Sequence, residues 1–365
     1  MSDAAPTSDP DTEARELLEE LVSIPSPAPE ETECAEALAD FFEEHGRTVF
    51  VDEVGNVRAP ADDSVLYTSH VDTVPGDIPV RVESGENGPE LWGRGSVDAK
   101  GPLAALAVAA VRTGVSFVGV VGEEVDSRGA RHLIEDRDPP ESVVNGEPSG
   151  WDGIALGYRG ILSGTYTGSS ELGHTSRPEN NAIQDAIAWW AAIEGRFGGE
   201  GTDTDAEDGE APRAGASPVF ERVTPKPVEI EGGVSGDGLA VEATLDVQLR
   251  VPPSHTTDDV RDLVDGELRS GSVEWTDAIE PTMQSPRTPL ARAFRAAVRG
   301  AGGDPRLLRK TGTADMNVYA EAWDCPMVTY GPGDSDLDHA PNEHLELREL
   351  DRAVAVLETV AEELQ

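Results

Sequence analysis

Apolar residues recur along most of this chain with one of two spacings. A recurrence every three or four positions predicts amphipathic helices, and short runs of β-branched and aromatic residues predict strands. The predicted helices cover residues 12–22, 30–44, 103–111, 128–135, 181–194, 257–268, 288–301 and 347–364. The predicted strands cover residues 48–53, 56–59, 65–69, 116–122, 142–145, 219–231, 239–250 and 327–330. Strands and helices therefore alternate, an order typical of α/β proteins.

The pattern changes in the middle of the chain. Residues 116–122 form a continuous apolar run, typical of a buried parallel strand, whereas residues 158–168 alternate between apolar and polar as in an edge strand. We predict an α/β fold in which a larger domain, residues 1–156 and 283–365, contains a mixed, mostly parallel sheet with helices on both faces. A smaller α+β domain of βαβ type, residues 157–282, interrupts it.

Composition narrows the possible partners. The chain has 28 Lys and Arg against 71 Asp and Glu, a formal charge of −43 at pH 7. Nucleic acids and anionic membranes bind cationic surfaces, so we expect neither as a partner. Only Lys100, Lys226 and Lys310 are lysines, and an acidic, lysine-poor composition is typical of a protein from a high-salt cytoplasm. An acidic, glycine-rich segment at 197–216 is predicted to be a solvated loop.

The protein is predicted to be cytosolic. Its first residues carry neither the basic nor the apolar region of a secretion signal. Its longest apolar run, residues 103–111, is far shorter than the about 20 residues of a membrane span. The two cysteines, Cys34 and Cys325, are too few to cross-link a chain of 365 residues. We expect both to be reduced.

The candidate chemistry lies where predicted strands end. Three successive predicted strands are followed by a histidine or by acidic residues, an aspartate lies in a glycine-rich turn before an apolar helix, and a histidine follows the last predicted strand. Open α/β sheets bind their ligands at the carboxyl ends of the strands. We therefore expect these side chains to lie together. They are His70, Asp98, Glu123, Glu124, Glu147 and His339.

Two histidines and three carboxylates form a ligand set that zinc accepts, with cobalt or manganese as substitutes. The five candidate ligands are His70, Asp98, Glu124, Glu147 and His339. Five side chains exceed the three that a single catalytic zinc ion uses, so we predict two metal ions about 3.5 Å apart. Asp98, in its tight turn, is the best candidate to bridge them. Singly, these residues have simpler explanations, because an isolated histidine is more often structural and most carboxylates of so acidic a chain lie on the surface. Their shared position after strands favours the metal site.

Two further features are predicted to support this site. Asp72 lies two residues after His70, so both side chains share one face of an extended segment, and Asp72 can accept a hydrogen bond from the second ring nitrogen of His70. Glu123 and Glu124 are adjacent and would point to opposite sides of an extended segment. One of them can bind metal while the other acts as a general base toward water, with a pKa raised by burial and lowered by the metal charge.

Taken together, the motifs HVDTVPG, GRGSVDAKGP, GEE, NGEPS and DHAPNEH resemble those of the M20 metallopeptidase and deacylase family of dinuclear zinc amidohydrolases, over essentially the whole chain. The resemblance implies a catalytic domain interrupted by a lid or dimerisation domain, a homodimer, and a cis peptide bond after Asp98. It also implies a role for each residue. His70, Glu147 and His339 would be terminal ligands, Asp98 the bridge, Glu124 the remaining ligand and Glu123 the general base.

The segments DAKGPLAA, KTGTADMNV and YGPGDSDLDHAPNEH resemble one branch of this family more closely. Its members act in lysine and arginine biosynthesis and release lysine or ornithine from an amino-group carrier protein of the LysW type. The bond they hydrolyse is the amide on the γ-carboxyl of the carrier's C-terminal glutamate. The alternative is the same chemistry on a small molecule, as in acetylornithine deacetylase or succinyl-diaminopimelate desuccinylase. A non-catalytic relative would lack a ligand or the base, and this chain lacks neither.

Further residues resemble substrate-binding positions of the family. His174 resembles a histidine that reaches the active site from the other subunit and stabilises the oxyanion; a surface loop position is the alternative. Arg250 resembles an arginine that pairs with a substrate carboxylate; a structural salt bridge is the alternative. A turn predicted to line the specificity pocket consists of Thr311, Gly312, Thr313 and Asp315. For Asp315 the alternative is a helix N-cap.

A basic cluster is predicted to be a docking surface for the carrier. Carriers of this branch are acidic, so docking on an acidic enzyme requires a local basic patch, while high salt weakens repulsion elsewhere. The cluster consists of Arg287, Arg292, Arg295, Arg299, Arg306, Arg309 and Lys310.

Overall fold

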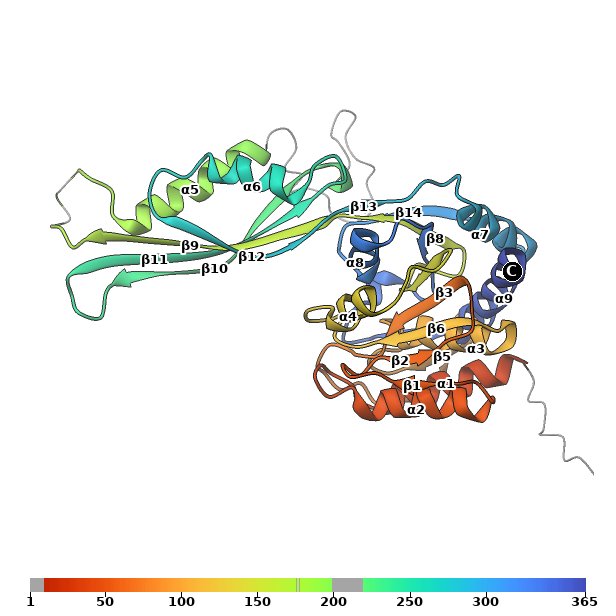
Figure 1. The fold of residues 1–365 in the computed structure, drawn as a ribbon. Helices are drawn as coiled ribbons and strands as arrows, with labels where there is room; N and C mark the ends of the chain where they lie inside the picture. Colours follow the sequence, from red (N-terminus) through yellow and green to blue (C-terminus); the bar gives the residue numbers. More distant parts are fainter. Residues whose placement is uncertain (1–9, 175, 177, 199–218) are drawn as a thin grey trace, which may run out of the picture. The chain divides into compact units, whose positions relative to one another are not determined.

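The computed structural model describes residues 10–174, 176, 178–198 and 219–365 (Figure 1). The chain forms two compact units. Unit 1 comprises residues 1–157, 284–308 and 314–365, and unit 2 comprises residues 158–283 and 309–313. From the sequence we predicted that residues 309–313 belong to the larger domain, but in the structure this segment belongs to unit 2. Most of the acidic loop predicted at 197–216 lies outside the described residues.

The main sheet of unit 1 has the strand order β1-β2-β6-β3-β7-β15-β8. Its four inner strands, β6, β3, β7 and β15, run parallel, and the flanking strands β2 and β8 are antiparallel to their neighbours. Strand bounds are β1 Phe50–Val51, β2 Val57–Ala59, β3 Asp62–His70, β6 Val115–Val120, β7 Val143–Gly146, β8 Gly153–Tyr158 and β15 Met327–Thr329. The chain passes between the units near β13 (Thr282–Met283) and β14 (Arg306–Lys310).

Helices cover both faces of this sheet (Figure 1). On one face, a Cβ on Gly119 of β6 would lie 2.7 Å from Leu38 of helix α2 (Thr32–Glu44), and a Cβ on Gly146 of β7 would lie 2.3 Å from Leu106 of helix α3 (Lys100–Thr113). At both positions side chains of the helices occupy the space that a Cβ would need, so a larger residue would force them to shift. On the other face, Thr68 of β3 contacts Tyr319 of α8. The mixed α/β class predicted from the sequence is confirmed.

The helices of unit 1 pack in two groups. On the face that includes Leu106, α1 packs on α2, α3 and α9, and α9 packs on α3 and α7; α4 packs on α8. Their bounds are α1 Pro10–Ser23, α2 Thr32–Glu44, α3 Lys100–Thr113, α4 Arg128–Asp136, α7 Pro289–Gly300, α8 Asp315–Ala322 and α9 Leu347–Leu364. Helix α3 is buried along most of its length, as its apolar sequence predicted. A separate three-stranded sheet has the order β16-β5-β4, with β4 Arg81–Ser84, β5 Pro89–Trp92 and β16 His344–Glu346.

Unit 2 contains an antiparallel sheet in the order β10-β11-β9-β12 with its own apolar core beneath α5 and α6. The bounds are β9 Gly160–Glu171, α5 Ala182–Phe197, β10 Thr224–Val234, β11 Ala240–Val251, α6 Thr257–Asp265 and β12 Ser272–Ile279. β9 and β10 run in the same direction with β11 between them, so β9, α5 and β10 form a split βαβ unit. From the sequence we interpreted residues 158–168, which include most of β9, as an edge strand. This interpretation is wrong, because β9 pairs with both β11 and β12.

Both cysteines are unpaired: Cys34 is buried and Cys325 is partly buried. None of the helices in the described ranges combines the length and the apolar character needed to cross a membrane.

Candidate metal centre

The site lies at the carboxyl ends of three adjacent parallel strands of unit 1. His70, the last residue of β3, pairs in register with Val120, the last residue of β6. Ser69 of β3 pairs with Gly146, the last residue of β7, which precedes Glu147. Because these strands end level with one another, the residues that follow them meet at one edge of the sheet, as the sequence predicted.

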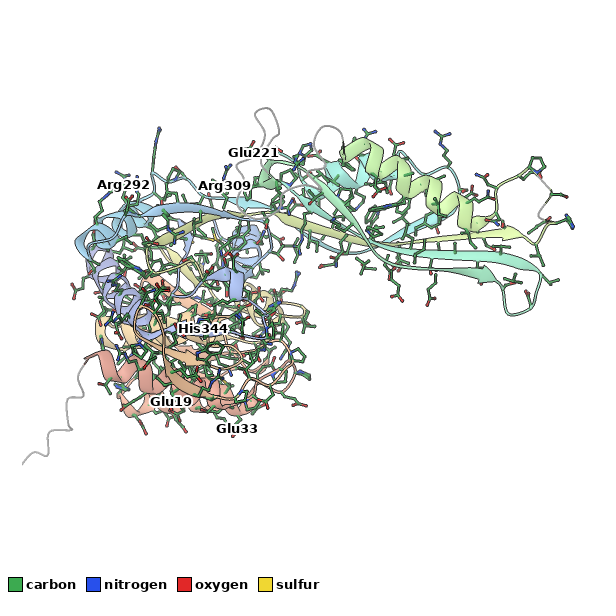
Figure 2. All side chains as sticks on the ribbon, turned by 180° about the vertical axis from the view of Figure 1, so that it is seen from behind. Glu19, Glu33, Glu221, Arg292, Arg309 and His344 are labelled. Atoms are coloured by element: carbon green, nitrogen blue, oxygen red, sulfur yellow. The ribbon has the colours of Figure 1, made fainter. Side chains whose placement is uncertain are left out.

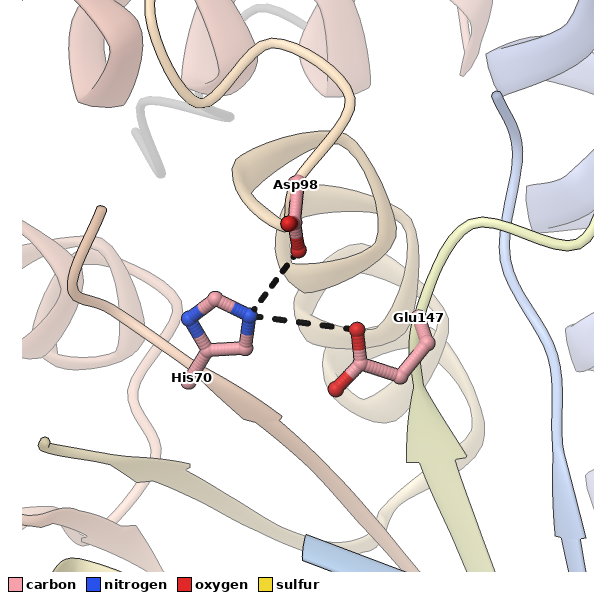
Figure 3. A group of neighbouring side chains, drawn as sticks. All are labelled: His70, Asp98 and Glu147. Atoms are coloured by element: carbon pink, nitrogen blue, oxygen red, sulfur yellow. Dashed lines mark hydrogen bonds and ion pairs between the residues drawn. The ribbon is translucent and has the colours of Figure 1, made fainter. Parts of the chain in front are cut away.

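The first group of side chains consists of His70, Asp98 and Glu147, whose ligand atoms lie within 4.8 Å of one another (Figure 3). The Nε2 atom of His70 is 3.3 Å from Oδ1 of Asp98 and 3.9 Å from Oε2 of Glu147. His70 is buried on β3, whereas Asp98 approaches from the loop before α3. The peptide bond after Asp98 is cis, as the family resemblance implied.

The second group consists of Asp98, Glu124 and His339. Nε2 of His339 lies 3.1 Å from Oδ2 of Asp98 and 3.0 Å from Oε2 of Glu124. Asp98 therefore belongs to both groups and turns one carboxylate oxygen toward each histidine. This is the arrangement that a bridging carboxylate requires, since each oxygen must reach a different cation.

Asp72 supports the site in a different way from the one predicted. The Nδ1 atom of His70 lies 2.9 Å from the backbone carbonyl oxygen of Asp72, whereas the carboxylate is 3.6 Å away, longer than a hydrogen bond. The carboxylate instead accepts the backbone N–H groups of Glu123 and Glu124, at 3.2 and 3.0 Å. Asp72 thus fixes the ring of His70 through its main chain and the two glutamates through its side chain.

Glu123 and Glu124 lie in a turn, not on an extended strand, because β6 already ends at Val120. Strand alternation therefore does not direct their side chains to opposite sides. Their separation comes from the turn and from the carboxylate of Asp72, which holds both backbone N–H groups. Burial and the charge of Glu147 raise the pKa of Glu123 well above its ordinary value. Burial raises the pKa of Glu124 to about 7, against the opposing charge of His70.

The pKa values of three other ligands, His70, His339 and Glu147, are also raised by their surroundings. Burial alone would lower the pKa of His70, but its contacts with Asp72 and Asp98 outweigh burial and raise the pKa. The contact with Asp98 raises the pKa of His339 to about 9. Burial raises the pKa of Glu147 well above its usual range. The centre therefore holds more carboxyl groups than its two imidazoles can neutralise.

Divalent cations fit this centre. Oε1 of Glu124 and Oε1 of Glu147 are buried, and among the described residues neither has a hydrogen-bond partner, so each is an acceptor left without a donor. An unpartnered buried carboxylate oxygen is costly, and a cation removes that cost. The surrounding donor atoms are imidazole nitrogens and carboxylate oxygens only, a set that suits zinc, cobalt or manganese.

The predicted specificity residues separate into two places. Asp315 is buried in unit 1 as the first residue of α8, and Ala314 occupies the N-cap position, so the N-cap alternative for Asp315 is wrong. Burial raises the pKa of Asp315 to about 6, and the charges of His70 and Asp72 act on it. Asp315 is therefore in the same unit as the metal centre.

The remaining specificity residues lie in unit 2. Arg250 of β11 donates to Oγ1 of Thr313 at 3.4 Å, and the backbone oxygen of Thr311 accepts from Arg159 at 3.0 Å. Within the described ranges no carboxylate lies at ion-pair distance from Arg250, so the structural salt bridge is not what holds it. Gly312, between Thr311 and Thr313, has open space where a side chain would stand.

His174 lies in unit 2, in the loop after β9. Its side chain is exposed, and its Nδ1 atom contacts the hydroxyl of Ser176 at 2.8 Å. An accessible imidazole on a loop is compatible with contact to a second subunit, and the role of His174 stays a prediction.

Two charged residues near the site were missed by the sequence reasoning. Lys100, 1% exposed, donates from Nζ to the backbone oxygens of Leu21 and Ile24 at the end of α1. Glu343 is fully buried beside the loop that carries Asp98. Both residues stand inside the motifs GRGSVDAKGP and DHAPNEH. The signal that would have identified them is a charged residue within four positions of a ligand in the same motif.

The fold and these two groups define a class of protein. It is an α/β protein with an inserted second unit and a paired centre of histidines and carboxylates suited to two divalent cations. Residues 66–363, more than half of the chain, match the sequence profile of peptidase family M20/M25/M40. The chain belongs to this family, which confirms the resemblance of its motifs.

Relatives and solved structures agree with this assignment. A protein from Deinococcus radiodurans named LysW-lysine hydrolase is 39% identical over 368 residues, covering 96% of this chain and 97% of that protein. A LysW-lysine/LysW-ornithine hydrolase from Sulfurisphaera tokodaii is 28% identical and covers 96% and 95%. The fold is similar to aminopeptidase PepT from Bacillus cereus, with a TM-score of 0.76, 19% identity and coverage of 97% and 98%. A dinuclear metal-binding M20 peptidase from Bacillus subtilis has a TM-score of 0.64, 12% identity and coverage of 96% and 97%.

Removing divalent cations is expected to lower the melting temperature of unit 1. Without cations the excess carboxyl groups repel one another, and two ions present at about 100 times their Kd would each stabilise the fold by about 2.7 kcal/mol. For a domain of this size that corresponds to a difference of about 10–20 °C. Calorimetry with a chelator, followed by restored Zn²⁺, measures it. An unchanged melting temperature would contradict the presence of a metal centre.

Proposed function

We propose that the protein is a metal-dependent amide hydrolase that releases lysine, ornithine or both from the C-terminal glutamate γ-carboxyl of a LysW-like carrier. The observation that carries the proposal is the pair of three-residue groups that share Asp98. The names of the relatives from Deinococcus radiodurans and Sulfurisphaera tokodaii support the substrate. The corresponding role is in lysine and arginine biosynthesis, in the cytosol.

The residues of the two ligand groups are proposed to hold two cations. His70, Asp98 and Glu147 would hold one cation, and Asp98, Glu124 and His339 the other, with zinc as the proposed ion and cobalt or manganese as substitutes. Bound there, the two ions would polarise the amide carbonyl and make water acidic enough to react near neutral pH.

Glu123 is the proposed general base. Its raised pKa suits a group that takes a proton from the attacking water and returns it to the leaving amine nitrogen. His174 of a second subunit is proposed to donate to the oxyanion, a contribution of about 3 kcal/mol. Arg250, partly buried and without a carboxylate partner among the described residues, is proposed to bind the substrate carboxylate. Asp315 with Thr311, Gly312 and Thr313 would complete the substrate contacts.

The alternative substrate is a small N-acyl amino acid. Full-length protein loaded with Zn²⁺ would be assayed in high salt, which the acidic composition favours, against carrier-lysine, carrier-ornithine, acetylornithine and succinyl-diaminopimelate. We expect kcat/KM for a carrier conjugate to exceed that for either small substrate by at least about 100-fold, or about 2.7 kcal/mol. The reverse order would select the small-molecule alternative. Tight amino-acid binding without turnover would contradict hydrolysis of any kind.

The basic cluster is the proposed docking surface for the carrier. No acidic residue occurs between Glu280 and Asp304. The side chain of Arg292 is labelled in Figure 2. Among the described residues it donates only to the backbone oxygen of Arg287, and the side chain of Arg295 donates only to the backbone oxygens of Pro286 and Ala291. Within the described ranges, neither of them nor Arg299 is paired with a carboxylate. By contrast, Arg306 and Arg309 are paired, with Asp152 and Glu221. The unpaired charge therefore lies on α7.

Reversing two charges on α7 tests this surface. Arg295→Glu with Arg299→Glu is expected to raise KM for the carrier conjugate about tenfold or more, because charge complementarity governs encounter. The same change should leave KM for acetylornithine unaltered. Arg348→Glu with Arg352→Glu on α9 is the matched control, with the same spacing and the same change in net charge. Equal effects of the two double variants, or no effect of the first, would remove α7 from the docking surface.

A homodimer through unit 2 is also proposed. Among the described strands β10 pairs only with β11, and its side chains of Val228, Ile230 and Val234 are 57–61% exposed. Ile187 of the adjacent helix α5 is 54% exposed. An unpaired strand edge beside exposed apolar residues is suited to association with a second copy.

Ile230→Glu is expected to raise the dimer dissociation constant at least about 100-fold, because it places a charge in an apolar interface. Sedimentation equilibrium over a range of concentrations measures this constant. Val82→Glu, at a residue of unit 1 that is 49% exposed, is the control. A wild-type chain that sediments as a monomer would contradict the dimer.

A further inference from the structure

Glu343 is a buried charge that connects two segments of the metal centre. Its side chain is 1% exposed. Oε1 accepts the backbone N–H groups of Val97 and Asp98, at 2.9 and 3.1 Å. Oε2 accepts the N–H of Gly95 at 3.1 Å. One carboxylate therefore binds three backbone groups of the loop that ends at Asp98, including the N–H of Asp98 itself.

Arg94 extends this connection to the loop of His339. Nη1 of Arg94 donates to Oε2 of Glu343 at 2.8 Å and to the backbone oxygen of Ala340 at 3.3 Å. Ala340 follows His339 directly. The pair of Arg94 and Glu343 thus joins residues 94–98 to residues 339–343, which lie almost 250 positions apart in the sequence.

This connection acts on the contact that relates the two groups of ligands. Asp98 is the residue they share, and His339 is the only histidine of the second group. Oδ2 of Asp98 lies 3.1 Å from Nε2 of His339, yet each residue lies on an irregular segment without a strand or helix to position it. Charge-assisted hydrogen bonds to backbone N–H groups are short and directional, so they fix a loop more tightly than apolar packing does.

We propose that Glu343 is a positioning residue that sets the orientation of the Asp98 carboxylate relative to His339, and so keeps the two groups at one spacing. The proposal rests on the proposed metal centre. Glutamine at this position would keep one acceptor oxygen but would turn an N–H₂ group toward donors that need an acceptor. Glu343→Gln therefore disturbs the loop without a change in side-chain volume.

Asp52 provides a matched control. Its Oδ1 atom also accepts three backbone N–H groups, from Val54, Gly55 and Asn56, and its Oδ2 atom pairs with Arg58. The side chain is 7% exposed. Asp52 lies between β1 and β2 and contacts none of the metal-centre side chains by hydrogen bond or ion pair. Asp52→Asn should therefore cost comparable stability without altering the metal centre.

The experiment compares full-length Glu343→Gln, Asp52→Asn and wild type by Co²⁺ titration against a competing chelator, by the visible absorption spectrum of bound Co²⁺, and by urea unfolding. We expect both variants to lower the urea midpoint. Only Glu343→Gln should weaken the binding of one Co²⁺, by the about 10–100-fold that is typical for residues that orient metal ligands. Only this variant should also change the Co²⁺ spectrum. Its kcat should fall by a similar factor with KM within about twofold. If it does not fold, Arg94→Gln, which removes the connection to Ala340, should show the same changes to a smaller degree.

The proposal would be overturned if Glu343→Gln, or its substitute Arg94→Gln, kept the wild-type Co²⁺ affinity and spectrum and were destabilised to the same extent as Asp52→Asn. These readouts involve no substrate. A wild type that binds two Co²⁺ ions but does not hydrolyse the carrier conjugate would contradict the proposed substrate alone. A wild type that binds no Co²⁺ would overturn both proposals.

Discussion

Glu123→Gln is expected to reduce kcat by about 10⁴-fold, or about 5.5 kcal/mol, while both metal ions remain bound. The glutamine has the shape of the glutamate but cannot accept the proton of the attacking water. None of the contacts within the two ligand groups involves Glu123, so cation binding should persist. Steady-state kinetics and metal analysis of the same preparation measure both properties.

Neighbouring variants separate the base from the ligand. Glu124→Gln should lose a metal ion as well as turnover, because Oε2 of Glu124 belongs to the second group. Asp126→Asn, at an exposed position of the same turn, should retain both. Loss of metal in Glu123→Gln, or substantial remaining turnover, would show that the two adjacent glutamates have been assigned in the wrong order.

Asp98→Asn is expected to reduce the metal content from two ions to one or none and to reduce kcat/KM by more than about 1,000-fold, or about 4 kcal/mol. Each oxygen of Asp98 faces a different histidine, and asparagine replaces one of them with an N–H₂ group that cannot bind a cation. Isothermal titration with Zn²⁺ gives the stoichiometry, and assays at saturating Zn²⁺ give the rate.

Glu147→Gln is the comparison for Asp98→Asn. Glu147 belongs to one group only, so its loss should weaken one cation site and leave the group of Asp98, Glu124 and His339 intact. Two ions bound with wild-type affinity in Asp98→Asn would show that Asp98 does not bridge. The interpretation of Asp98 as the carboxylate shared by the two cation sites would then have to be abandoned.

The acidic residues of the centre differ in the direction in which their surroundings shift the pKa of the carboxyl group. Burial would raise the pKa of Asp98, but contact with His339 and His70 holds it well below its usual range, whereas burial raises the pKa of Glu147 and of Glu123. These shifts favour the ionised form of Asp98 and the protonated forms of Glu147 and Glu123. The two glutamates need additional positive charge before they are fully ionised, which the proposed cations supply.

Several features were predicted wrongly because they depend on where the chain turns. The apolar run at 116–122 predicted a strand up to Gly122, but β6 ends at Val120 because Gly122 adopts a positive φ and begins a turn. That turn, and not strand alternation, separates Glu123 from Glu124. The alternation at 158–168 indicated an exposed edge, yet β9 is covered on one face only and paired along both edges.

The sequence by itself determined the class of fold and the types of ligand. Hydrophobic periodicity depends on local geometry, and the residues after parallel strands must meet at one edge of the sheet, so the order of residues alone groups His70, Glu124 and Glu147. Only the tertiary structure decided how Asp98 divides its two oxygens, which atoms of Asp72 act, and that Glu343 holds the Asp98 loop. These depend on contacts between segments as far as 248 residues apart, whose distances no local pattern contains.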